Sequence, residues 1–141
     1  DYLLSGGKRI YGIAVDDAHQ FKRWGPQFVN PGRGWVVIRA NRLDAAELMR
    51  NLEAGAFYAS TGVVLDDVVV TDRAIEVRIS QDRNFRYRTE FIGDKGESLA
   101  EQSGVVARYQ LPAGSRMTYV RAKVTDSMGR VAWVQPVFVA R

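Results

Sequence analysis

The chain has 141 residues, a formal net charge of +4 and no cysteine. This length allows one domain with a hydrophobic core, or one domain plus a remnant of another. The lack of cysteine excludes a disulfide framework and a thiol nucleophile, but it leaves the compartment open. Basic residues are scattered among acidic ones, and no apolar stretch is long enough to cross a bilayer, so we expect neither a nucleic-acid nor a membrane partner.

The first five residues are typical of the last turn of a helix that stops at Gly6 and Gly7. Because five residues cannot hold a helix in water by themselves, we expect the chain to be a fragment that begins within a helix. Residues 8–15 then predict a buried strand of the parallel type, because apolar residues lie on both of its faces.

This predicted strand stops at Asp16, Asp17, Ala18 and His19. Side chains two apart share a face of a strand, so Asp17 and His19, the only histidine, would point the same way, and Asp16 would point away. A carboxylate and a neutral imidazole are ordinary ligands of divalent metals, and α/β proteins collect their chemistry at the carboxyl ends of strands. The spacing alone also suits a polar turn that binds nothing.

Residues 20–34 contain two prolines, three glycines and two phenylalanines around Trp24, which predicts a structured loop. Arg33, between two of the glycines, is a candidate anion contact, because a guanidinium binds phosphate or carboxylate. The alternative for Arg33 is a solvated turn. Residues 35–40 predict a short apolar strand.

Residues 45–54 predict the one strongly marked helix. Asp44 is placed as its N-cap, and Glu47 at the third helical position completes a capping box. Leu43 would pack onto Leu48 as a hydrophobic staple. We therefore expect a helix that lies on a sheet.

From residue 57 onward the hydrophobic period changes to two, which predicts half-buried antiparallel strands with short turns between them. The alternation is clearest in residues 75–79, 85–91 and 120–124. In the last predicted strand, residues 131–139, Pro136 indicates an edge position or a bulge. About seven short strands without intervening helices favour a two-sheet sandwich.

The expected fold class is therefore mainly β (α+β). An antiparallel immunoglobulin-like β-sandwich should occupy residues 57–141 as an accessory domain. A short α/β segment, residues 1–56 with the helix at 45–54, should precede it.

Three segments together resemble one known family. They are KRIYGIAVDDAH at 8–19, GWVVIRA at 34–40 and GAFYASTG at 55–62. In order and spacing they are similar to the closing third of the polymerase and histidinol phosphatase (PHP) family of metallohydrolases, and more narrowly to its bacterial carbaryl-hydrolase-like subgroup. The resemblance implies that residues 1–56 are the end of a distorted β/α barrel that binds divalent ions and acts as a phosphoesterase or related hydrolase.

The resemblance further implies that Asp17 and His19 are the Asp-x-His metal ligands of the last barrel strand. Asp16 is a candidate acceptor that orients His19, although its opposite facing favours a purely structural role. It implies Zn, Mn or Fe in the parent protein and a phosphorylated small molecule as a partner. Family members also carry a His-x-His pair and further His and Glu ligands, which a single histidine excludes here. We therefore expect the N-terminal barrel portion to be missing, so that this chain binds no metal tightly and is inactive alone.

An alternative function is a non-catalytic immunoglobulin-like module for ligand binding or subunit association. In that interpretation exposed aromatic side chains bind a sugar, a peptide or another subunit. The candidates are Trp24, Tyr58, Tyr109 and Trp133. An oligomer is compatible with either function, and both a cytoplasmic and an exported location stay open.

Overall fold

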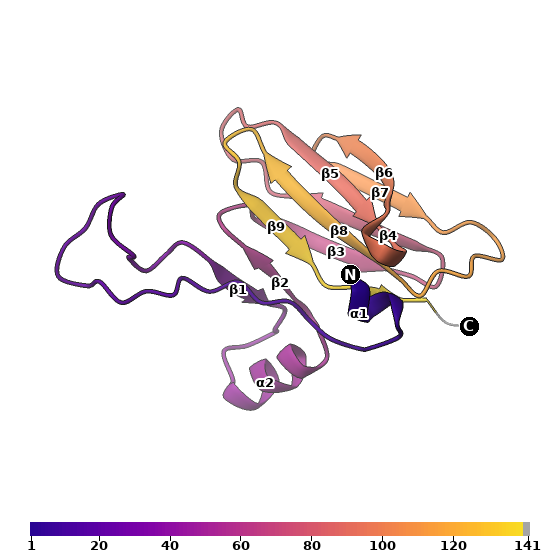
Figure 1. Cartoon of the computed structure of the whole chain (residues 1–141), viewed down its shortest axis with the longest axis horizontal. Helices are drawn as coiled ribbons and strands as arrows, with labels where there is room; N and C mark the ends of the chain where they lie inside the picture. Colours follow the sequence, from indigo (N-terminus) through magenta and orange to yellow (C-terminus); the bar gives the residue numbers. More distant parts are fainter. Residues whose placement is uncertain (140–141) are drawn as a thin grey trace.

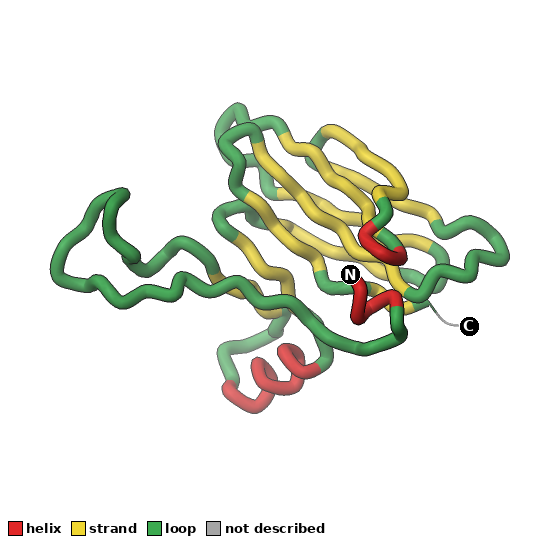
Figure 2. Tube along the Cα trace, viewed as in Figure 1, coloured by secondary structure: helices red, strands yellow, loops and turns green. Residues whose placement is uncertain are grey.

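The computed structural model describes residues 1–139, which consist mainly of β-strands (Figures 1 and 2). The helices are α1 (Tyr2–Ser5), α2 (Ala45–Glu53) and the short 3₁₀ helix η1 (Asp94–Gly96). The strands are β1 (Trp35–Ile38), β2 (Phe57–Ser60), β3 (Leu65–Val70), β4 (Ala74–Ile79), β5 (Tyr87–Ile92), β6 (Ser98–Ser103), β7 (Val106–Gln110), β8 (Tyr119–Asp126), β9 (Val131–Val134) and β10 (Val137–Phe138). The predicted mainly β fold class is confirmed.

The strands form two antiparallel sheets that lie face to face (Figure 1). The larger sheet has the order β1-β2-β9-β8-β5-β6, with β10 also paired to β8, and the smaller has the order β3-β4-β7. Nine strands, β2 to β10, replace the predicted seven or so. The difference arises partly because β6 carries few apolar residues, and partly because the last predicted strand is divided into β9 and β10.

Inward-facing side chains of the two sheets make one core, as the predicted period of two requires. Val77 of β4, Phe91 of β5 and Val124 of β8 are completely buried in it. Burial of each such side chain contributes about 1.5–3 kcal/mol to the free energy of unfolding. The sandwich therefore has a core of its own.

The last predicted strand is interrupted by a bulge at Gln135 and Pro136. The pairing with β8 shifts by one residue there, from Lys123↔Trp133 on β9 to Val120↔Val137 on β10. Such a shift inserts an extra residue on one strand. The bulge that Pro136 predicts is therefore confirmed.

Helix α2 starts at its predicted cap. The Asp44 side chain accepts a hydrogen bond from the backbone N–H of Glu47 at 2.9 Å. The second hydrogen bond of the predicted capping box, from the Asp44 backbone N–H to the Glu47 side chain, is absent. The Glu47 carboxylate accepts from the backbone N–H of Asn41 instead. The predicted staple of Leu43 onto Leu48 is also wrong, since Leu43 is 95% exposed.

The predicted boundary between residues 56 and 57 falls between two paired strands. β1 pairs with β2 along its whole length, from Trp35↔Ser60 to Ile38↔Phe57. Residues 8–34, by contrast, contain no helix or strand. The segment contacts the sandwich at Tyr11 and Gly12 and then reaches away from it (Figures 1 and 2). We call this segment the arm.

Candidate metal-ligand arm

The arm begins where the sequence predicts a buried parallel strand, and this prediction is wrong. Residues 8–15 form no strand, and Ile13 and Val15 are 64% and 69% exposed. A parallel strand needs neighbours that complete its hydrogen bonds and cover both of its faces. Residues 1–139 supply neither, so this apolar run stays irregular and open to solvent.

Asp16 ties the two branches of the arm together. Its carboxylate accepts hydrogen bonds from the backbone N–H groups of Gly32 (2.9 Å), Gly34 (2.6 Å) and Arg33. These bonds, first that of Gly32 and then that of Gly34, favour the charged form and lower the pKa of Asp16. Within the described part of the chain no hydrogen bond joins Asp16 to His19, so Asp16 holds the loop rather than the imidazole.

His19 is oriented by the backbone of Asp17. Its Nδ1 lies 2.7 Å from the carbonyl oxygen of Asp17. Because a carbonyl only accepts, Nδ1 is the donor in this contact, and in a neutral ring Nε2 then keeps the lone pair. Metal-binding histidines commonly donate a hydrogen bond from their second ring nitrogen to a carbonyl in this way. The exposed imidazole of His19 is therefore oriented so that its neutral form can offer Nε2 to a metal.

Asp17 has a left-handed backbone conformation, with φ of +52°. This conformation is uncommon outside glycine, and aspartate is one of the residues that tolerate it. The predicted alternation of faces assumed an extended backbone, so it does not describe how Asp17 and His19 are arranged. Both side chains are exposed.

The part of the chain that the structure describes holds no complete set of metal ligands. Among residues 1–139 no group of three or more His, Cys, Asp or Glu side chains is placed to hold a metal ion. A catalytic zinc usually has three protein ligands. Asp17 and His19 have suitable donor atoms, but they fit a metal only if another segment supplies further ligands.

The tip of the arm is a folded loop closed by Asn30, which is 7% exposed. Its Nδ2 donates to the carbonyl oxygens of Gln20 (2.7 Å) and Arg23 (2.9 Å), and its Oδ1 accepts from Gly25. The predicted structured loop is confirmed, although the sequence did not single out Asn30. An asparagine beside a proline in a glycine-rich loop was the available signal.

Arg33 lies at the base of this loop. Its backbone N–H is used by Asp16, while its side chain is exposed. Arg33 as an anion contact stays a prediction.

Only some of the aromatic side chains that we expected on the surface are exposed. Trp24 is 67% exposed, but Tyr58 is 8% exposed, and its hydroxyl accepts a hydrogen bond from the Leu65 amide. Tyr109 is stacked on Phe91 with 5.6 Å between ring centroids. The prediction is therefore wrong for Tyr58, because it points inward from β2 toward the smaller sheet.

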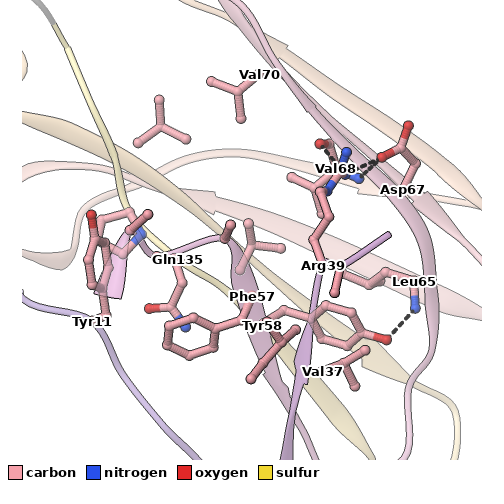
Figure 3. Close-up of a pocket in the computed structure, with 18 of the residues that line it drawn as sticks. Tyr11, Val37, Arg39, Phe57, Tyr58, Leu65, Asp67, Val68, Val70 and Gln135 are labelled. Carbon is pink, nitrogen blue, oxygen red and sulfur yellow. Dashed lines mark hydrogen bonds and ion pairs between the residues drawn. The ribbon is translucent and has the colours of Figure 1, made fainter. Parts of the chain in front are cut away.

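A groove of about 530 Å³ lies between β1, β2 and β3 (Figure 3). Its walls are both apolar and polar, with Val37, Tyr58 and Asp67 among them. Arg39, just after β1, forms an ion pair with Asp67 of β3 and also donates to the Val68 carbonyl at 3.1 Å. The hydrogen bond from Arg39 lowers the pKa of Asp67. This pair bridges the two sheets beside the groove.

No protein-family model matches the chain, and a search of curated proteins finds no match for it. Within residues 1–139 no helix has the length and apolar character needed to cross a membrane. Function is therefore inferred from the geometry of the arm and the groove, together with the resemblance in sequence.

Proposed function

We propose that this chain is the C-terminal part of a metal-dependent phosphoesterase or related hydrolase of the PHP family. In this proposal Asp17 and His19 supply two ligands to a cluster of Zn, Mn or Fe ions, and an N-terminal barrel portion supplies the others. The observation that carries the proposal is the hydrogen bond from His19 Nδ1 to the Asp17 carbonyl at 2.7 Å, which leaves Nε2 available to a metal.

The exposed apolar side chains of the arm support the same proposal. Ile13, Val15, Phe21 and Trp24 are each between 64% and 69% exposed. Apolar side chains gathered in this way on one segment are typical of a surface that another part of the protein covers. A barrel portion packed against the arm would bury them and bring in the missing ligands.

The residues of the arm would then have distinct roles. A bound divalent ion lowers the pKa of its water, so that hydroxide is available near neutral pH. His19 donates its lone pair at Nε2, and Asp17 contributes a carboxylate oxygen. Arg33, whose amide is held by Asp16, presents its guanidinium to the phosphoryl group of a phosphorylated small molecule.

The purified chain offers a first test, because two ligands hold a metal only weakly. After equilibration with Zn²⁺ or Mn²⁺, we expect near-zero bound metal in both the wild type and His19→Ala, and no phosphatase turnover above background. The reading frame upstream should encode a His-x-His pair. Chelator-sensitive hydrolysis by this chain that survives His19→Ala would contradict the proposal.

A second candidate function is a non-catalytic sandwich module, and the groove favours it. A volume of about 530 Å³, with apolar and polar walls and one ion pair, is within the range of small-ligand sites. In this alternative the groove or the exposed Trp24 binds a ligand or another subunit. A full-length protein that holds no metal, and whose ligand binding is lost in a groove-filling Val37→Trp variant, would favour this candidate.

A further inference from the structure

We infer that Gln135 is a positioning residue that fastens the arm, and with it Asp17 and His19, to the sandwich. The consequence for metal binding rests on the proposed function. The attachment itself rests on contacts between residues that lie far apart in the sequence.

Gln135 is 7% exposed and binds the backbone of Gly12 at both ends of its amide. Its Oε1 accepts from the Gly12 N–H at 2.9 Å, and its Nε2 donates to the Gly12 carbonyl at 2.8 Å. This side chain thus replaces the pair of hydrogen bonds that a residue of a neighbouring antiparallel strand would make. Gly12 precedes Asp17 by five residues, so the arm is held close to its candidate ligands.

The bulge between β9 and β10 places Gln135 at this point. Bulges redirect side chains and are common next to functional sites. A buried amide needs partners for both its donor and its acceptor atoms, and the Gly12 backbone supplies both. The interruption of the strand at Pro136 therefore coincides with the point where the sandwich holds the arm.

Tyr11 makes a second contact beside this one. Its ring packs edge-on against Phe57 and Phe138, with 6.2 and 6.5 Å between ring centroids. A Cβ at Gly55 would lie 2.4 Å from the Tyr11 ring, so only glycine leaves room for it. Figure 3 shows Tyr11 and Gln135 at the same end of the groove, away from Asp67. The arm is thus attached by one apolar and one polar contact.

The chain contains a matched control for Gln135. Gln102 on β6 also binds a backbone at both ends of its amide, accepting from the Arg108 N–H at 2.9 Å and donating to its carbonyl at 2.7 Å. Gln102→Leu therefore removes the same two kinds of hydrogen bond as Gln135→Leu, but away from the arm. Gln135→Glu keeps the acceptor for the Gly12 N–H but replaces the donor by a carboxylate oxygen that faces the Gly12 carbonyl.

Hydrogen exchange of the Gly12 backbone amide, which donates to Gln135, tests the attachment. We expect this amide to exchange at least about tenfold faster in Gln135→Leu, because its acceptor is gone. The rate should be intermediate in Gln135→Glu and unchanged in Gln102→Leu. Unchanged Gly12 exchange in Gln135→Leu, or equal acceleration in Gln102→Leu, would overturn the inference.

Metal affinity of the full-length protein tests the consequence. Gln135→Leu should weaken Zn²⁺ binding by about 10- to 100-fold, as loss of a residue that orients metal ligands does, and Gln102→Leu should not. Faster Gly12 exchange with unchanged Zn²⁺ affinity would overturn the positioning of the ligands. If the full-length wild type holds no metal, the proposed function fails, while the exchange experiment still decides whether Gln135 holds the arm.

Discussion

A buried carboxylate organises the turn between β8 and β9. The side chain of Asp126 is 0% exposed and binds Arg130 Nε at 2.5 Å. It also accepts from the backbone N–H groups of Met128 (2.8 Å) and Arg130 (2.9 Å). Burial raises the pKa of Asp126, but the hydrogen bonds from Arg130 and from these amides outweigh it, so the pKa is lowered overall.

The lowered pKa of Asp126 predicts a loss of stability in acid. Because its pKa is lower in the folded chain, the unfolded chain binds the proton more readily. The stabilisation is therefore present above the unfolded pKa of about 4 and is lost as the pH falls through the folded pKa. Asp126→Asn should lower the free energy of unfolding by about 1.5–3 kcal/mol at pH 7 and flatten its acid dependence.

Urea unfolding at several pH values between 7 and 2 measures both effects. Asp72→Asn is the matched control, because the Asp72 side chain is 88% exposed. It should change neither the free energy of unfolding nor its pH dependence appreciably. The same acid dependence in Asp126→Asn and in the wild type would contradict this account of the turn.

Asp16 provides a prediction for the arm alone. Asp16→Ala removes the acceptor of three backbone amides, Gly32 to Gly34. We expect these amides to exchange faster with solvent, while the free energy of unfolding changes little, because the bonds lie within the arm and outside the core. Asp17→Ala should leave them protected. Equal exchange rates of these amides in Asp16→Ala and in the wild type would show that Asp16 does not hold the arm.

The residue-level features of the candidate site were only partly predictable. The sequence indicated Asp17 and His19 as candidate ligands beyond an apolar run, and both side chains are exposed. It could not indicate the proton position on His19, which depends on a contact with the Asp17 carbonyl. Nor could it indicate Gln135, because its partner Gly12 is 123 residues away.

At the scale of single elements, Gly55 in the loop after α2 lies where Tyr11 of the arm contacts the sandwich. Gly55 has φ of +75°, and a Cβ there would meet the Tyr11 ring. Gly114 has φ of +72°, but nothing lies within 4 Å of its Cβ position. The two glycines thus have similar positive φ angles and different surroundings.

We predict that Gly114→Ala costs about 1 kcal/mol of unfolding free energy, the strain of a left-handed alanine. Gly55→Ala should cost clearly more, because it also displaces Tyr11. In a Tyr11→Ala background the cost of Gly55→Ala should fall to that of Gly114→Ala, which chemical denaturation of the four variants measures. Equal costs at both glycines in the wild-type background would contradict the contact.

Sequence patterns correctly predicted the features that depend on residues close together in the sequence. The cap at Asp44, the alternation in β4 and the break at Pro136 depend on near neighbours in the sequence, and all three are found. Residues 8–15 carry the composition of a buried strand, yet they form none. A suitable composition is only one requirement of a buried strand. Other segments must complete its hydrogen bonds and cover its two faces.

At the scale of the whole molecule, a sandwich with its own core carries a long arm that has none. The core follows from the period of two and was predictable. The course of the arm was not, because it depends on single contacts such as Gln135 with Gly12 and Asp16 with Gly34. In the proposed function the sandwich is the support that holds Asp17 and His19 where a barrel portion completes the metal site.

Metal content of the purified full-length protein tests this proposal most directly. Bound Zn, Mn and Fe per chain would be measured in the wild type, His19→Ala, Asp17→Ala and the control Asp72→Asn. We predict bound metal in the wild type and the control, and at least about tenfold weaker binding in the two ligand variants. Equal metal content in all four proteins, or none in the wild type, would contradict it.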